Sequence, residues 1–97
     1  MNAVICKIKM HIPQSQSLKE KRRVLQSMLK RMRNQYNISI AEVDDQDLWQ
    51  MATIGLSCVC NSHGHAGEIV DSMLNFIRQT YPEVEIVNHE SEILQGF

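Results

Sequence analysis

The chain has 97 residues, of which 43% are hydrophobic and 22% charged, and its formal net charge is −1. This length and composition are typical of one folded domain over residues 1–97 and exclude a disordered chain. The near-neutral total hides an uneven distribution. Nine of the ten Lys and Arg residues precede position 34, and ten of the eleven carboxylates follow it. Such asymmetry favours a polyanionic partner, usually a nucleic acid, for the basic part.

The beginning of the chain contains no targeting signal and no membrane span. The first twelve residues alternate apolar and polar side chains and include Lys7 and Lys9. A signal peptide would need a continuous apolar stretch, and a bilayer span would need a much longer one. Three cysteines cannot all pair with one another. We therefore expect a cytoplasmic protein with reduced thiols and no membrane contact.

Hydrophobic periodicity assigns the first two elements. The period of two from Val4 to Ile12 predicts a half-buried strand that ends at Pro13. Ser17 and Glu20 have the spacing of a capping box, which predicts a helix over residues 18–34. One side of this helix forms an apolar stripe of Leu18, Leu25, Met28, Leu29 and Met32. Lys21 falls within that stripe, so it either extends past the sheet edge or pairs with an acid such as Asp44 or Asp47.

The middle of the chain predicts a hairpin. Residues 38–44 form a second strand, whose apolar pattern changes phase between Ile40 and Ala41, as a bulge would cause. An acidic connection over residues 44–50 leads to a third strand over 51–60. That strand places on its core face Ala52, Ile54, Leu56, Cys58 and Cys60.

The last third predicts one more helix and one more strand. Asn61 or Ser62 caps a helix that continues to about Thr80. Its apolar stripe comprises Ala66, Ile69, Val70, Met73, Phe76 and Ile77. Pro82 closes the next turn, and a short strand follows in which Val84, Ile86 and Asn88 face one way. We assign no element to residues 90–97.

The resulting order is β-α-β-β-α-β. Two β-α-β units that share one sheet give a ferredoxin-like α+β sandwich, with a four-stranded antiparallel sheet and two helices on one face. The other face of the sheet is then open to solvent or to a partner.

The first helix carries the strongest functional signal. A band beside its apolar stripe contains Lys19, Arg22, Arg23, Lys30 and Arg33. Such a band can bind several phosphates, and the single acid Glu20 cannot neutralise it by pairs along the helix. The alternative is that these bases only solvate the helix surface. We expect a nucleic-acid contact through phosphates and shape, because the strands lack the aromatic side chains on which RNA-binding sheets stack bases.

Two other sets of residues are candidates for a partner contact and for a metal site. Trp49, the only tryptophan, either anchors its loop against the core rim or is exposed as a partner contact. A metal site would use Cys58, Cys60, His63 and His65. These cysteines lie on the predicted core face and have one residue between them instead of the two to four usual for zinc, so we expect no metal and no cofactor.

Motifs of known catalysts are absent from the sequence. It contains no glycine-rich phosphate loop, no nucleophile elbow and no H-E-x-x-H pattern. We expect a protein that is not an enzyme and has no small-molecule substrate.

Three blocks occur in order along the chain, at residues 16–22 (QSLKEKR), 36–44 (YNISIAEVD) and 46–50 (QDLWQ). Together they resemble the YlxP-like family of small bacterial proteins of unassigned function. The resemblance covers essentially the whole chain and implies a ferredoxin-like fold. It also implies an RNA or ribosome association, because such proteins are typically encoded among translation and ribosome-maturation genes. The Cys and His cluster is not part of this pattern.

The sequence therefore predicts a small binding protein whose first helix contacts rRNA or a ribosomal subunit. The alternative is a protein-interaction module that uses the open sheet face or an edge strand, for example to form a homodimer.

Overall fold

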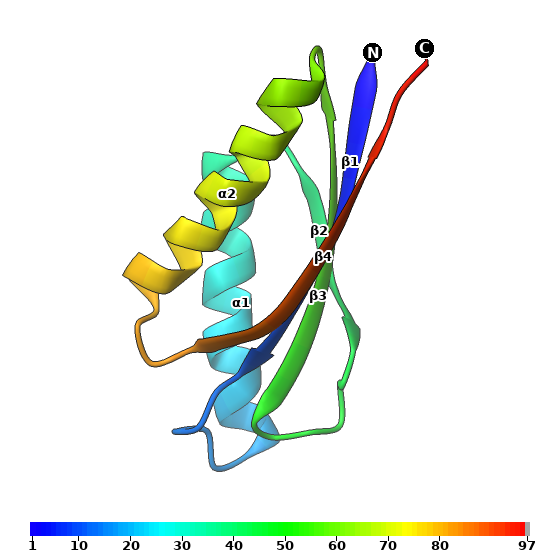
Figure 1. Cartoon of the computed structure of the whole chain (residues 1–97). Helices are drawn as coiled ribbons and strands as arrows, with labels where there is room; N and C mark the ends of the chain where they lie inside the picture. Colours follow the sequence, from blue (N-terminus) through cyan, green and yellow to red (C-terminus); the bar gives the residue numbers. More distant parts are fainter. Residues whose placement is uncertain (97) are drawn as a thin grey trace.

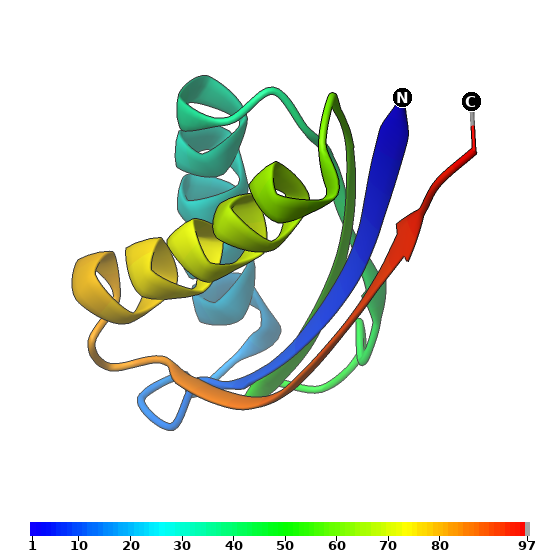
Figure 2. The same ribbon diagram turned by 45° about the horizontal axis from the view of Figure 1, so that its top comes forward.

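The computed structural model describes residues 1–96 and has the β-α-β-β-α-β order that the sequence predicts. The elements are β1 (Asn2–His11), α1 (Leu18–Gln35), β2 (Ser39–Asp44), β3 (Met51–Cys60), α2 (His63–Thr80) and β4 (Glu85–Leu94). The strands form one antiparallel sheet in the order β2-β3-β1-β4. Both helices cover the same face of this sheet (Figures 1 and 2). The ferredoxin-like α+β class is confirmed.

Both helices begin at the predicted caps. Ser17 Oγ accepts the backbone N–H of Glu20 at 3.1 Å, and the Glu20 carboxylate accepts the N–H of Gln16 at 2.6 Å. Ser62 caps α2 in the same way, with its Oγ accepting the N–H of His65. These side chains satisfy N–H groups that have no partner within the helix, so the helix starts are encoded locally.

The core lies between the helices and the covered face of the sheet. In β1 and β3 the side chains of the even-numbered residues 4–10 and 52–60 are buried, as the period of two predicts. The helices contribute to this core Leu25, Met28, Met32, Ala66, Val70, Met73, Leu74 and Ile77. Leu18, Leu29, Ile69 and Phe76 of the predicted stripes are only partly buried, and Leu74 was missed.

Strand β4 is longer than predicted, and Asn88 faces the other way. Because of a register shift, Met10 lies opposite Ile86 whereas Lys9 lies opposite Asn88, so Val87 is an extra residue in β4. Beyond the shift Asn88 shares the open face with Lys9 and not the core face with Ile86. The polar residues that follow form a strand because their backbone pairs with β1 up to Leu94.

The bulge in β2 lies three residues later than predicted. Residues 39–42 pair regularly with β3, and the register shifts between Glu42 and Asp44. Val43 is the extra residue, and it lies close over Gly55 of β3. A Cβ atom at Gly55 would come within 2.9 Å of Val43 Cγ1, so glycine allows this close approach.

Lys21 is fully buried and connects α1 to the β2–β3 hairpin. Its Nζ donates to the carbonyl oxygens of Asp45, Met51 and Gln46 at 2.8, 3.1 and 3.2 Å. Glu42 Oε2 lies 3.1 Å from the same nitrogen but accepts no hydrogen bond. An ammonium has three N–H donors, so the carbonyls take its protons and Glu42 supplies the compensating charge. The ion pair is therefore with Glu42, and the expected partners Asp44 and Asp47 were wrong.

These contacts fix the β2–β3 loop. Asp45 adopts a positive φ of 62°, and its Oδ2 accepts the hydroxyl of Thr53 at 2.6 Å. At the other end of the loop, the Gln50 side chain donates to the carbonyls of Pro13 and Ser15, both at 3.2 Å. The backbone N–H of Ile12 donates to the carbonyl of Gln50 at 2.7 Å. The loop is therefore tied to the segment before α1 as well as to α1 itself.

A search of the helices within the described residues found none that is long and apolar enough to cross a membrane.

Replacing Lys21 by Met should destabilise the protein strongly. The change leaves three carbonyls and a partly buried carboxylate without their cation, which we expect to cost about 2–4 kcal/mol in the free energy of unfolding. Urea denaturation followed by circular dichroism measures this cost. Lys19→Met removes an exposed lysine of the same helix and should change stability by less than about 0.5 kcal/mol. Equal losses in the two variants would contradict the central role of Lys21.

Candidate nucleic-acid interface

The predicted basic band is exposed on α1. Lys19, Arg22, Arg23 and Lys30 all have exposed side chains. Ion pairs within residues 1–96 involve the lysines of β1 and Lys21 but none of these four residues. Their spacing of three, four and seven residues places them along one side of the helix. Their charges are therefore available to an external anion.

Arg33, the fifth predicted residue, has a structural contact in addition. Its Nη2 donates to the carbonyl of Ile40 in β2 at 2.8 Å. The neighbouring Arg31, which lies outside the predicted band, has its guanidinium 5.8 Å from the centre of the Tyr81 ring. Arg33 thus marks the border between the band and the edge of the sheet, and Arg31 faces the end of α2.

Trp49 is exposed and does not anchor its loop. Its side chain retains 57% of its accessible surface, and that of its neighbour Leu48 retains 48%. The loop is held instead by Lys21 and Gln50, through the carbonyl contacts described above. The anchoring role that the sequence suggested for Trp49 is wrong, whereas its exposure is what a partner contact requires.

The open face of the sheet is mainly charged. Lys7 pairs with Glu90, and Lys9 pairs with Asp45, each at 3.9 Å. A hollow of about 230 Å³ between these pairs is lined by Lys7, Lys9, Asp44, Thr53, Asn88 and Glu90. The four strands contain no Phe, Tyr or Trp. This face therefore lacks the large aromatic rings on which RNA-binding sheets stack bases.

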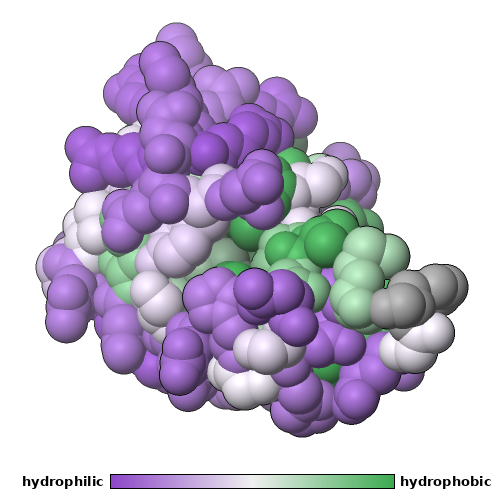
Figure 3. Space-filling view, turned by 90° about the horizontal axis from the view of Figure 1, so that it is seen from above, coloured by the Kyte–Doolittle hydropathy of each residue, from purple (hydrophilic) through white to green (hydrophobic). Residues whose placement is uncertain are grey.

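A cleft of about 460 Å³ lies where α1 ends and α2 begins. Tyr36, Ile38, Cys58, Val59 and Ile69 supply its apolar lining. Figure 3 views this end of the molecule and shows hydrophobic residues exposed between hydrophilic ones. No local sequence pattern indicates this cleft, because its walls come from segments that are far apart along the chain.

The four residues weighed for a metal site do not gather in one place. Cys58 and Cys60 are buried, with 7% and 6% exposure. His63 Nδ1 lies 2.8 Å from the amide nitrogen of Gln95, and His65 Nδ1 lies 3.7 Å from Glu68. A search of the described residues found no group of three or more His, Cys, Asp or Glu side chains able to hold a metal ion.

Burial also makes the thiols poor ligands and nucleophiles. It raises the pKa of Cys6, and burial together with the neighbouring Cys60 raises the pKa of Cys58. A raised pKa leaves less thiolate at a given pH, and the thiolate is the form that reacts and binds metals. The cysteines of β1 and β3 therefore act as small apolar side chains.

Comparison with known proteins found one matching family model and one similar curated protein. The family model, described as "Protein of unknown function (DUF503)", matches residues 3–91. The chain is 41% identical over 69 residues to the uncharacterized protein YlxP of Bacillus subtilis (strain 168), which covers 71% of this chain and 74% of that protein. These similarities confirm the family resemblance inferred from the sequence.

A solved structure supports the fold. The de novo designed protein Foldit4 aligns with 98% of this chain and 99% of its own length, with a TM-score of 0.55 and 11% sequence identity. At this low identity the likeness concerns the fold alone.

The thiols should react slowly with a disulfide reagent in the native protein. Because the cysteines are buried and two have raised pKa values, we expect labelling by dithionitrobenzoate at pH 8 to be about tenfold slower, or more, than in urea. A cysteine introduced by Asn75→Cys, at an exposed position of α2, is the matched control for free reactivity. Native cysteines that react as fast as this control would contradict the assignment.

Proposed function

The chain belongs to the DUF503 family, whose function is unknown, and we propose that it is a small cytoplasmic, non-enzymatic protein that binds rRNA or a ribosomal subunit through α1. The observation that supports this most directly is the set of exposed, unpaired cations on α1. Lys19, Arg22, Arg23 and Lys30 present four positive charges along about three turns of one helix. RNA supplies a regular series of phosphates that such a row can neutralise.

The distribution of carboxylates also supports this proposal. The exposed Glu90 of β4 pairs with Lys7, and the partly buried Asp45 of the β2–β3 loop pairs with Lys9, on the open face of the sheet. The folded chain thus pairs the lysines of β1 with acids, whereas Lys19, Arg22, Arg23 and Lys30 of α1 form no ion pair within residues 1–96. A helix whose bases served only solubility would gain from pairs with nearby acids, and α1 has only Glu20, which is used in its cap.

The proposal predicts salt-sensitive binding that depends on Arg22 and Arg23. Co-sedimentation with ribosomal subunits and free rRNA, over a series of salt concentrations, measures it. Each lost phosphate contact should reduce the slope of log affinity against log salt by about 0.7–0.9, so R22Q/R23Q should reduce it by about 1.5 and weaken binding at every salt concentration.

The matched control places the same charge change elsewhere. N75E/Q79E lowers the net charge by two, as R22Q/R23Q does, but at exposed positions of α2. It should change binding much less than R22Q/R23Q. Equal losses would show that only net charge matters, and no binding of the unmodified protein at low salt would refute the proposal.

A second function, self-association through the β4 edge, is favoured by one specific observation. β4 lies at the edge of the sheet and is ten residues long. Two of its aliphatic residues are exposed, Val87 to 56% and Leu94 to 40% of their full accessible surface. A long unpaired edge with exposed aliphatic residues can pair with another strand.

Light scattering between low and high micromolar concentration tests self-association. If β4 pairs between copies, the mass should approach that of a dimer, and Val87→Lys should keep the protein monomeric. Val43→Lys, on the opposite edge strand and 50% exposed, is the matched control. A monomer at all concentrations, at both low and high salt, would remove this alternative.

A further inference from the structure

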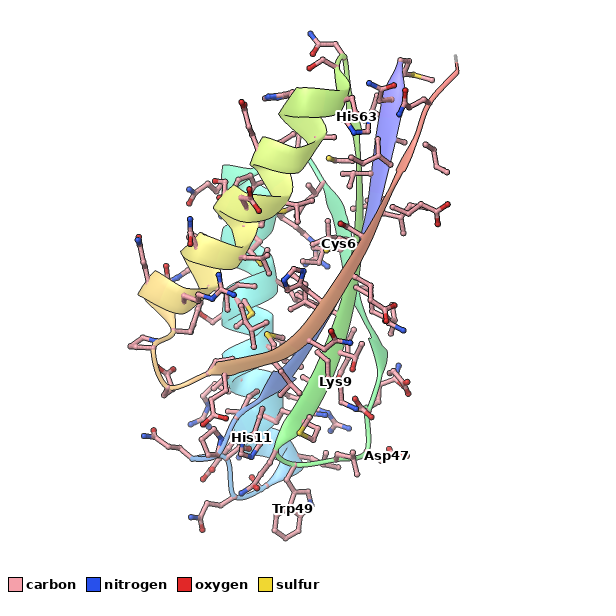
Figure 4. The ribbon with its side chains drawn as sticks, in the orientation of Figure 1. Cys6, Lys9, His11, Asp47, Trp49 and His63 are labelled. Atoms are coloured by element: carbon pink, nitrogen blue, oxygen red, sulfur yellow. The ribbon has the colours of Figure 1, made fainter. Side chains whose placement is uncertain are left out.

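The largest apolar side chain of the protein lies outside the core. Trp49 and Leu48 are about half exposed and do not belong to the buried cluster. Figure 4 shows the indole of Trp49 pointing away from the body, at the end of the molecule where α1 begins. Exposing an indole costs the free energy that its burial would supply, so a rigidly held, exposed Trp indicates a contact surface.

The loop that carries Trp49 is held by hydrogen bonds on both sides of this residue. Lys21 binds the carbonyls of Asp45, Gln46 and Met51, which lie on both sides of Trp49 along the chain. Gln50, the next residue, is bonded to the segment before α1. A partner that stacks on this ring would therefore lose little affinity to the ordering of the loop.

The same contacts bring the loop to the basic end of α1. Lys21 lies between Lys19 and Arg22 in the sequence, and its ammonium reaches into the loop. Lys19, Arg22 and Arg23 are exposed on the first turns of the same helix and form no ion pair within the described part of the chain. An exposed indole and three free cations thus lie at one end of the molecule.

We infer that this end of the molecule binds a single-stranded segment of RNA, with a base stacked on Trp49 and neighbouring phosphates on the first turns of α1. The inference rests on the proposed function and specifies which form of RNA the protein binds. A ring beside a row of cations is the arrangement by which proteins bind unpaired strands. In a duplex the bases are already stacked on one another and cannot reach the indole.

The carboxylates of the loop allow RNA to be distinguished from a cationic protein segment as the ligand. Asp45 is engaged with Thr53 and Lys9, and Asp44 accepts the backbone N–H of Asp45. Asp47 is exposed and forms no ion pair within residues 1–96. Its charge repels a phosphate chain, so Asp47→Asn should strengthen RNA binding. A cationic protein segment on Trp49 would instead be held by Asp47 and weakened by the same change.

Because Trp49 is the only tryptophan, the tryptophan fluorescence of the protein measures ligand contact at this residue. The titrants are a 12-residue oligouridylate, an abasic 12-mer with the same number of phosphates, and a 12-base-pair RNA duplex, all at low salt. We expect the oligouridylate to quench the fluorescence of Trp49, and the abasic strand to bind about tenfold more weakly with little quenching.

Variants are compared by the anisotropy of fluorescein-labelled strands. Trp49→Ala should weaken oligouridylate binding by about tenfold and leave abasic binding unchanged, whereas Trp49→Phe, which keeps a ring, should lose less. Val59→Ala removes another exposed apolar side chain, 67% exposed and in the cleft region at the other end of the molecule, and should have no effect. R22Q/R23Q should weaken binding of both strands.

The outcomes separate this inference from the proposed function. Equal binding of the oligouridylate and the abasic strand, unaffected by Trp49→Ala but lost in R22Q/R23Q, would overturn the stacking and leave the phosphate contact. A preference for the duplex would do the same. Weaker RNA binding in Asp47→Asn would also overturn the inference. No binding of any strand at low salt would overturn this inference, and the proposed function would be overturned as well only if co-sedimentation with ribosomal subunits and free rRNA were also negative.

Discussion

The position of the β2–β3 hairpin depends on one buried ammonium group. Lys21 is fully buried, donates to three carbonyl oxygens and lies against the carboxylate of Glu42. An isolated charge in this place would be very costly, so the hairpin and α1 are stable together only in the arrangement that surrounds it. That arrangement determines where the loop leaves the sheet and therefore where Trp49 lies.

The same fold separates two kinds of charged surface. On the sheet, Lys7 and Lys9 lie beside acids from β4 and the loop, because antiparallel pairing brings these segments into register. On the exposed side of α1, Lys19, Arg22, Arg23 and Lys30 form no ion pair within residues 1–96. The uneven charge along the chain thus becomes an uneven charge in space, with the free cations on one helix.

The family match establishes relatedness and the fold establishes an architecture, but neither establishes an activity, so function is inferred from particular side chains. The sheet, on which some RNA-binding domains stack bases, contains no Phe, Tyr or Trp here. An exposed ring occurs instead in the β2–β3 loop, next to the basic turns of α1. All three thiols are buried and the pKa values of Cys6 and Cys58 are raised, which argues against redox or metal chemistry as their role.

Local sequence patterns determined the element order, both helix caps and most of the core, because periodicity and capping depend on residues within a few positions of one another. They also located the basic band. Only the tertiary structure decided that Lys21 pairs with Glu42, that Trp49 is exposed and that β4 extends to Leu94. Each of these depends on contacts between distant segments: the hairpin carbonyls gathered around an ammonium, and a polar strand held by the backbone of β1.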